Sequence, residues 1–187
     1  MWNDYITLLL VSASAGLLVL AAYFYWGLTS PRPQVFAPAL AAPGLILLAV
    51  GLHMVLTWPI KGGFAFANVC FGEPSVLFGA ILLAAALTVG RRWPMHGVAL
   101  LGLVGGLVDI VIGAGIYNNW LTQKPDIACV GFVLTGVLGL LALPTVANPT
   151  KVLRTFTAIL TLLAAMLWGG MGLVSYWAHV AGAAGIK

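Results

Sequence analysis

A carboxylate inside a long apolar run is the residue whose type and position most clearly suggest chemistry. Asp109 lies within GVALLGLVGGLVDIVIGAGIYNNW, eight residues before Tyr117, and would therefore sit about 12 Å below that end of a helix. An ionisable group at the centre of a membrane helix costs at least about 2.5–3.5 kcal/mol and usually has a partner. Asp109 could bind a proton or cation, ligate a metal, or oppose the charge of a substrate. The alternative is a structural aspartate that is protonated or hydrogen-bonded, since no lysine or arginine lies at matching depth.

Histidine offers a second possible chemistry, because neutral imidazole binds both haem and metal ions. His53 lies five residues before Trp58, about 7 Å below that helix end, and His179 lies near the end of the last apolar run. No HxxxH, ExxH or CxxCH spacing occurs. His53, Asp109 and Glu73 are therefore metal or haem candidates without a supporting motif, and no cofactor is clearly implied. A packed, hydrogen-bonded His53 is the simpler interpretation.

The connection between the second and third apolar runs carries several polar groups. Residues 57–74 read TWPIKGGFAFANVCFGEP and include Asn68 and Glu73. Glu73 followed by proline is a good helix start, because the helix dipole favours a carboxylate in the first turn. Glu73 could instead line a pore mouth, where it would attract cations or bind a substrate. We expect residues 59–74 to form an extracytoplasmic loop folded over the outer half of the helices, where Asn118 and His179 also lie.

Two cysteines could add a covalent link. Cys70 lies in this connection and Cys129 near the start of the fifth apolar run, both on the predicted outer side. A disulfide between them would join the loop to the fourth connection. Two free buried thiols are the alternative, because the sequence does not show whether the two Cα atoms approach within about 7 Å.

The elements that must position these residues are membrane helices. The chain has 187 residues, of which 62% are hydrophobic and only 6% are charged, whereas a soluble domain is about a quarter charged. A spanning helix needs about 20 mainly apolar residues. Six such runs occur, at residues 5–28, 37–58, 73–90, 95–119, 127–147 and 152–179. The sequence therefore predicts an all-α, polytopic membrane bundle of six transmembrane helices, and a single domain over residues 1–187 because no linker or repeat divides it.

The positive charges indicate how these helices are oriented. The first, third and fifth connections hold cationic residues and no acid: Arg32, Arg91, Arg92, Lys151 and Arg154. The other side holds Lys61, Lys124 and Lys187, which acidic residues offset. By the positive-inside rule, both termini are extracytoplasmic, in a multi-pass protein of the cell (plasma) membrane. The basic excess therefore reflects topology in a lipid bilayer and does not indicate nucleic acid.

Small residues and prolines predict how the helices meet. One face of the fourth run carries residues that recur every three or four positions: Gly102, Gly105, Gly106, Asp109, Gly113 and Tyr117. Glycines let helix backbones approach closely in lipid, so Asp109 should point into protein or a water-filled cavity rather than into lipid. Pro43 and Pro144 interrupt predicted spans, either as kinks for packing or as breaks at a transport site.

The stretch TWPIKGGFAFANVCFGEPSVLFG, residues 57–79, resembles a family of small multi-pass bacterial and archaeal membrane proteins of unknown function. That resemblance covers the second and third runs with their connection, and it implies a helical membrane protein without an assigned activity. The shorter run PSVLFGAIL is similar to the third helix of the amide and urea channel family, whose members also have six spans. This likeness implies an oligomeric channel, although the pore-lining acids of that family do not map onto residues of this sequence.

Several classes of function remain, and an enzyme is the least supported of them. The sequence has no nucleophile–base pair, phosphate-binding glycine loop, paired carboxylates or metal motif. The leading hypothesis is a non-catalytic accessory subunit of a larger membrane protein complex, which contacts other membrane subunits or copies of itself through glycine-rich faces and the outer loop. One alternative is an oligomeric channel or transporter for a small solute, although the inner half of most helices shows no continuous polar path. The other is a haem- or metal-binding redox protein.

Overall fold

The computed structural model describes residues 5–184, and the regular elements within them are all helices. Six are long and apolar enough to cross a membrane: α1 (Tyr5–Tyr25), α2 (Ala37–Thr57), α4 (Gly72–Gly90), α5 (His96–Asn118), α6 (Pro125–Ala147) and α7 (Lys151–Ala183). The others are short: η1 (Gly27–Thr29), η2 (Pro33–Phe36), η3 (Gly62–Phe64) and α3 (Ala67–Cys70). The predicted all-α bundle of six transmembrane helices is confirmed.

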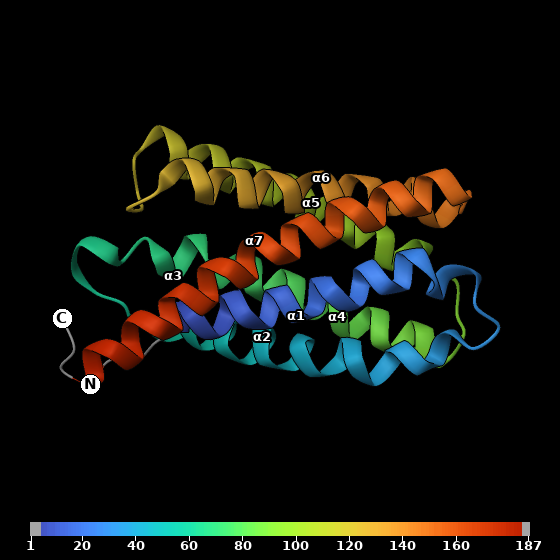
Figure 1. Ribbon diagram of the computed structural model, residues 1–187, viewed down its shortest axis with the longest axis horizontal. Helices are drawn as coiled ribbons and strands as arrows, with labels where there is room; N and C mark the ends of the chain where they lie inside the picture. The colour runs from blue at the N-terminus through green and yellow to red at the C-terminus, as the bar shows by residue number, and fades with distance from the viewer. Residues whose placement is uncertain (1–4, 185–187) are drawn as a thin grey trace.

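The ends of the predicted spans agree with the helices to within a few residues, and two differences are informative. α1 ends at Tyr25 rather than at residue 28, because Trp26 begins the turns that lead to Pro31 and Pro33. α7 continues to Ala183 and is about 50 Å long at 1.5 Å per residue, more than a membrane core of about 30 Å requires. It crosses the bundle obliquely (Figure 1).

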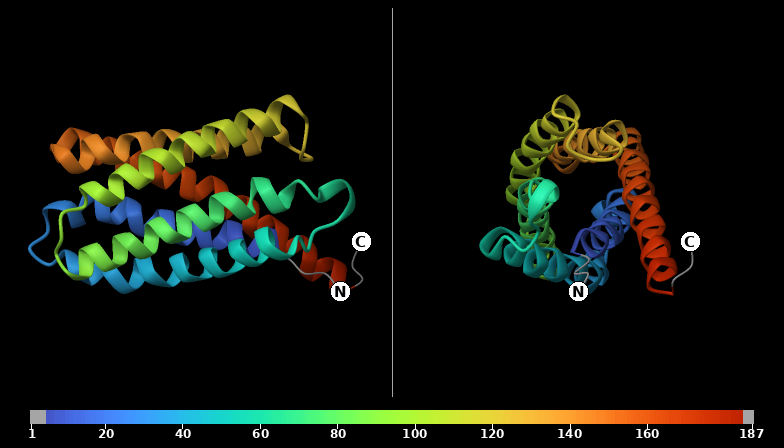
Figure 2. Two further views of the ribbon diagram at one scale, coloured as in Figure 1. Left: turned by 180° about the vertical axis from the view of Figure 1, so that it is seen from behind. Right: turned by 90° about the vertical axis from the view of Figure 1, so that its left-hand side faces the viewer.

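The six long helices form a closed ring in which each contacts the helix before it and the helix after it. Around the ring the order is α1, α2, α4, α5, α6, α7 and back to α1. The end view in Figure 2 shows this ring. Three neighbouring pairs lie closest together, namely α1·α7, α2·α4 and α5·α6, while the contacts between these pairs are looser. The ring is therefore built from three tight helix pairs.

Glycines let the helix backbones of all three pairs approach closely. In α2·α4, a Cβ atom on Gly79 would lie 2.5 Å from the backbone nitrogen of Leu48. In α5·α6, a Cβ atom on Gly136 would lie 2.7 Å from the carbonyl oxygen of Gly106. In α1·α7, a Cβ atom on Gly172 would lie 3.3 Å from the backbone nitrogen of Val11, and Ser14 Oγ also donates a 2.8 Å hydrogen bond to the carbonyl oxygen of Ala165. Close backbone packing and such interhelical bonds drive helix association in lipid.

The glycine face of α5 packs within the chain and does not form a free docking surface. Gly106 lies against the backbone of α6, and a Cβ atom on Gly113 would meet Phe132 and the carbonyl oxygen of Cys129 on that helix. The hypothesis that this face binds another subunit loses its basis, because α6 of the same chain already occupies it.

Two prolines lie inside helices without ending them. α2 continues through Pro43, which is buried, and α6 continues through Pro144. Neighbouring helices can compensate for the missing backbone donor of a proline in a membrane helix. The interpretation of either proline as a break in a discontinuous helix is therefore wrong.

The connections lie at two opposite ends of the ring (Figure 1), and the two ends differ in the charges of their residues. Residues 26–36, 91–95 and 148–150 join helices at one end, which we call the arginine end. Residues 58–71 and 119–124 join helices at the opposite end, which we call the loop end. α1 begins and α7 ends at the loop end, as an even number of antiparallel helices requires.

Arginine side chains hold the connections of the arginine end together. Arg154 Nη1 donates hydrogen bonds to the carbonyl oxygen of Tyr25, at 2.7 Å, and to Thr29 Oγ1, at 2.8 Å. A cation beside the last carbonyls of α1 also interacts favourably with the negative end of that helix dipole. Arg92 Nε donates to Gln34 Oε1 at 3.2 Å. Arg154 and Arg92 therefore link the connections of this end to one another.

Residues 58–71 at the loop end fold into a compact connection around one asparagine. Trp58 ends α2 in the left-handed conformation, with φ 49°. Asn68 is fully buried, and its Oδ1 accepts a 3.2 Å bond from the Ile60 N–H. Its Nδ2 donates to the carbonyl oxygens of Ile60, at 2.7 Å, and Ala65, at 2.9 Å. The expected loop over residues 59–74 is thus partly helical, and its last residues already belong to α4, which begins at Gly72.

Candidate functional site

The interior of the ring contains two adjoining cavities. The large cavity has about 770 Å³ of empty space, including the part that opens outward, and is lined mainly by α1, α4, α5 and α6. The small cavity has about 460 Å³ on the same basis, and Trp168 of α7 also lines it. Both cavities touch the same five residues, which we call the waist: Leu17, Pro74, Phe78, Asp109 and Thr135. The waist is therefore where the two cavities meet.

The two cavities lie toward opposite ends of the ring. Tyr23 and Val146, near the arginine end of their helices, line the large cavity. Leu9 and Phe71, near the loop end, line the small cavity. Asp109 lies between them, nine residues before the end of α5 at Asn118. The cavities and the waist together follow the interior of the ring from one end toward the other.

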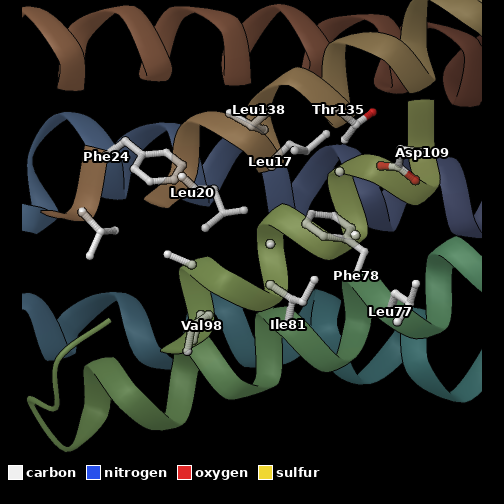
Figure 3. A pocket seen from close by; sticks show the side chains of 18 of the residues that line it. Leu17, Leu20, Phe24, Leu77, Phe78, Ile81, Val98, Asp109, Thr135 and Leu138 are labelled. Atoms are coloured by element: carbon white, nitrogen blue, oxygen red, sulfur yellow. The ribbon is translucent and has the colours of Figure 1, made fainter. Parts of the chain in front are cut away.

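Polar side chains at the waist are few and lie close to one another. Figure 3 shows Asp109 and Thr135 on the same side of the large cavity, with Phe78 facing them. In the described part of the chain, the only other polar side chains that line the cavities are Tyr23 in the large one and Ser75 and Trp168 in the small one. All other side chains that line the cavities are apolar, so a solute would meet its main polar contacts at the waist.

Asp109 faces this interior, as the glycine spacing of α5 predicts. It lines both cavities, and Gly102, Gly105 and Gly106 on the same helix line the large cavity beside it. Within residues 5–184 the structure shows no hydrogen bond or ion pair to its carboxyl group. Of the two forms of the structural alternative, a hydrogen-bonded aspartate therefore has no partner among these residues, while a protonated one is not tested.

Thr135 is held in place by two hydrogen bonds on α6 and α7. Its Oγ1 donates to the carbonyl oxygen of Gly131 at 2.6 Å and accepts the indole N–H of Trp168 at 3.2 Å. Gly131 leaves room for the indole, because a Cβ atom there would lie 2.7 Å from Trp168 Cζ2. Phe132 packs edge-on against the same indole, with ring centroids 5.0 Å apart. Trp168 is 4% exposed and is thereby fixed in one orientation.

His53 lies outside the cavities. It is exposed on α2, where its Nε2 forms a 3.0 Å hydrogen bond with Tyr5 Oη of α1. The two rings also stack, with centroids 5.4 Å apart. Thr57 donates to the carbonyl oxygen of His53 at 2.7 Å. The structure thus supports the packed, hydrogen-bonded interpretation of His53, which joins α1 to α2 near the loop end.

The remaining sequence candidates lie near the loop end, and Glu73 directly precedes Pro74 of the waist. Glu73 is exposed in the first turn of α4, Asn118 is exposed at the end of α5, and His179 is exposed near the end of α7. Cys70 and Cys129 are both half-buried free thiols, so the suggested disulfide is not formed in the structure. None of these residues lines either cavity.

The structure does not assemble a metal site from the sequence candidates. Among residues 5–184, no group of three or more His, Cys, Asp or Glu side chains is placed to hold a metal ion. His53 lies on the outer surface of α2, Glu73 lies exposed at the start of α4, and Asp109 faces the interior. These three residues therefore do not form the joint site that the haem or metal hypothesis requires.

Sequence reasoning missed most of the waist. Leu17 and Thr135 lie in the middle of apolar runs, where nothing distinguishes them from neighbouring core residues, and Phe78 is noticeable only as part of the run PSVLFGAIL. The position of Trp168 could have been noticed in the sequence. Tryptophan in membrane helices is enriched at the two membrane–water interfaces, whereas Trp168 lies in the interior of α7. A mid-span tryptophan indicates a side chain with a buried hydrogen-bond partner.

Comparisons with known proteins agree with this architecture. A family model described as "Protein of unknown function (DUF981)" matches residues 1–182, so the resemblance seen over residues 57–79 extends over nearly the whole chain. No curated protein matches the chain in sequence. The fold is similar to that of the Helicobacter pylori urea channel solved in its closed state, with a TM-score of 0.75 at 16% sequence identity. The similarity covers 92% of this chain and 98% of that chain, and at this identity it concerns the fold alone.

Proposed function

The chain belongs to the DUF981 family of proteins of unknown function, and we propose that it is a membrane channel or transporter which passes a small solute through the helix ring. The observation that carries this proposal is the pair of cavities that meet at the waist. A ring of spanning helices with a cavity toward each end is the arrangement that a solute pathway needs. The similarity in fold to a urea channel supports the same class of function.

The cavity lining favours a small uncharged solute over an ion. Among residues 5–184, Asp109 is the sole charged residue that lines either cavity. Ion pathways supply rings of carbonyl oxygens or charged side chains to replace the hydration shell of the ion. An uncharged solute has less hydration to replace, and one polar position between two apolar cavities is sufficient to bind it during passage.

Reconstitution into liposomes tests this proposal. The purified protein is incorporated into liposomes, and the entry of urea, acetamide and glycerol is followed by stopped-flow light scattering. We expect at least one of these solutes to enter about tenfold or more faster than in protein-free liposomes, which corresponds to a barrier about 1.4 kcal/mol lower. Entry rates that equal those of protein-free liposomes for every solute would contradict the proposal.

The accessory-subunit hypothesis has less support than the channel or transporter, because the surfaces that it required to bind a partner contact other parts of the same chain. The α5 glycines pack against α6, and Asn68 ties residues 58–71 to one another. The exposed apolar faces of the ring remain for lipid and for copies of the same chain. If native mass spectrometry of the gently solubilised protein showed a mixed assembly with a fixed partner, the accessory-subunit hypothesis would be preferred over the channel or transporter.

We further infer that the arginine end faces the cytoplasm and that residues 59–74 are extracytoplasmic. Five Lys and Arg residues lie at or next to the arginine end, as the positive-inside rule requires of the cytoplasmic side. In a background with Cys70→Ala and Cys129→Ala, we expect Lys61→Cys to react in intact cells with a membrane-impermeant maleimide. Lys151→Cys should react after the cells are opened, and the reverse pattern would invert the topology.

A further inference from the structure

The Thr135 hydroxyl at the waist can offer a solute an acceptor and no donor. A hydroxyl has one proton and two lone pairs. The proton of Thr135 goes to the carbonyl oxygen of Gly131, at 2.6 Å, and one lone pair receives the N–H of Trp168, at 3.2 Å. One lone pair therefore remains. The indole of Trp168 has a single N–H, which this bond already uses, so Trp168 offers no donor either.

Asp109 adds the second acceptor group at the waist. When ionised, its carboxylate accepts hydrogen bonds through both oxygens and donates none, whereas when protonated it keeps an acceptor oxygen and gains one O–H donor. Leu17, Pro74 and Phe78 contribute no polar side-chain atom. The polar side chains of the waist therefore present acceptors from two helices, α5 and α6, facing the same interior space (Figure 3).

We propose that the waist is a hydrogen-bond-acceptor filter, in which Asp109 and Thr135 select small solutes that carry N–H or O–H donors. This inference rests on the proposed function as a channel or transporter. A donor-bearing solute that leaves water for the apolar cavities regains hydrogen bonds at the waist. While Asp109 is ionised, a solute of equal size with acceptors alone finds no donor at the waist, so its polar atom stays unpaired, and this is costly in an apolar environment. Such a solute is excluded.

Trp168 is the positioning residue of this filter. Its N–H occupies one lone pair of Thr135, and this leaves the threonine proton committed to Gly131. Gly131 and Phe132 fix the indole, as described above, and hold its N–H toward α6. Without the threonine hydroxyl, the same N–H would be unpaired beside the cavity and would become a donor.

Acetamide and dimethyl sulfoxide are the probes that separate donors from acceptors. They have the same number of non-hydrogen atoms and a strong acceptor oxygen each, but acetamide alone carries N–H donors. Stopped-flow light scattering on liposomes that contain the full chain gives the permeability to each solute after subtraction of the protein-free rate. We expect the acetamide to dimethyl sulfoxide ratio to be about tenfold or more, the effect of one unpaired polar group.

Three nearly isosteric variants test the named side chains. Asp109→Asn replaces a carboxyl oxygen by an amide donor, and Thr135→Val removes an acceptor while freeing the N–H of Trp168. Both should lower the ratio about tenfold, toward one. Thr135→Ser keeps the hydroxyl and should keep the wild-type ratio. The ratio reports selectivity rather than folding, because a protein that is partly misfolded loses permeability to both solutes together.

The outcomes distinguish the filter from the channel. If acetamide, urea and glycerol all enter liposomes with the wild-type protein no faster than they enter protein-free liposomes, the channel and the filter are both refuted. If acetamide and dimethyl sulfoxide enter the wild-type liposomes at equal rates, the channel stands and the filter is refuted. A high wild-type ratio that Asp109→Asn and Thr135→Val both leave unchanged also refutes the assignment of the filter to these residues.

Discussion

Replacing Gly102 with leucine is expected to reduce solute permeation to the level of protein-free membranes. Gly102 lines the large cavity, and the nearest atom to a Cβ at this position would be Ala142 Cβ, at 3.6 Å. The α5·α6 pair can therefore accept the new Cβ, while the rest of the leucine side chain occupies the interior. We expect a loss of about tenfold or more in permeability, or about 1.4 kcal/mol in the barrier. Stopped-flow light scattering with the solute that the wild-type protein passes fastest measures this loss.

Gly97→Leu is the matched control for this variant. Gly97 lies on the same helix, is exposed, lines neither cavity, and would have no atom within 4 Å of a new Cβ. We expect this variant to keep the wild-type permeability. An equal loss in both variants would show that leucine disturbs α5 rather than the path. Full permeability in Gly102→Leu would place the solute path outside the large cavity.

The substitution Gly106→Ala should destabilise the protein by about 1–3 kcal/mol, the usual cost of overpacking a tight contact. A Cβ atom there would lie 3.1 Å from Gly139 Cα and 3.2 Å from the backbone nitrogen of Leu140, and closer still to the carbonyl oxygen of Gly136. These neighbours are backbone atoms of α6, so they cannot turn away as a side chain can. The two helices must separate, and the Tm of the detergent-solubilised protein should fall by several degrees.

Gly115→Ala on the same helix provides the comparison. A Cβ atom on Gly115 would meet nothing within 4 Å. Alanine is a better helix residue than glycine, so this variant should be neutral or more stable by up to about 1 kcal/mol. Thermal unfolding followed by intrinsic fluorescence measures both variants. If Gly106→Ala unfolded at the wild-type Tm, α5 and α6 could not be in the close contact described here.

The helices and the direction of Asp109 could be predicted because both follow from the bilayer. Lipid offers no partner to a backbone amide, so apolar runs of sufficient length must be helical. The glycines that recur along α5 then identify its buried face, and Asp109 lies on it. The expected cavity-facing position of Asp109 is confirmed for the same reason, since lipid is a poor environment for a carboxyl group.

The acceptor pair at the waist could not be predicted in this way. Thr135 and Trp168 lie 33 residues apart on different helices, and no periodicity within one helix connects them. A mid-span threonine that bonds to the carbonyl four residues earlier is common in helices and carries no functional signal. Their relation to Asp109 depends on how three helices are arranged around one space, which is a property of the ring.

Glycine spacing also left the contact partner undetermined. The same small residues serve helix pairs within one chain and between chains. The information that decides the matter lies on α6, where Gly136 and Gly139 stand opposite Gly106. Each helix of the pair thus has glycines where the backbone of the other helix approaches. The sequence of one helix alone does not show that the other carries matching glycines. The leading hypothesis from the sequence assigned this face to another subunit because the sequence did not show that the α6 glycines lie opposite it.

The closure of the ring by α1 and α7 has a consequence for how the protein is made. The α2·α4 and α5·α6 pairs join helices that are neighbours in sequence, so each can assemble soon after it leaves the ribosome. α1 must wait for the sixth spanning helix, α7, before Ser14 can reach the carbonyl oxygen of Ala165. A nascent chain that stops before α7 therefore has an open ring and lacks Trp168, which lines the small cavity.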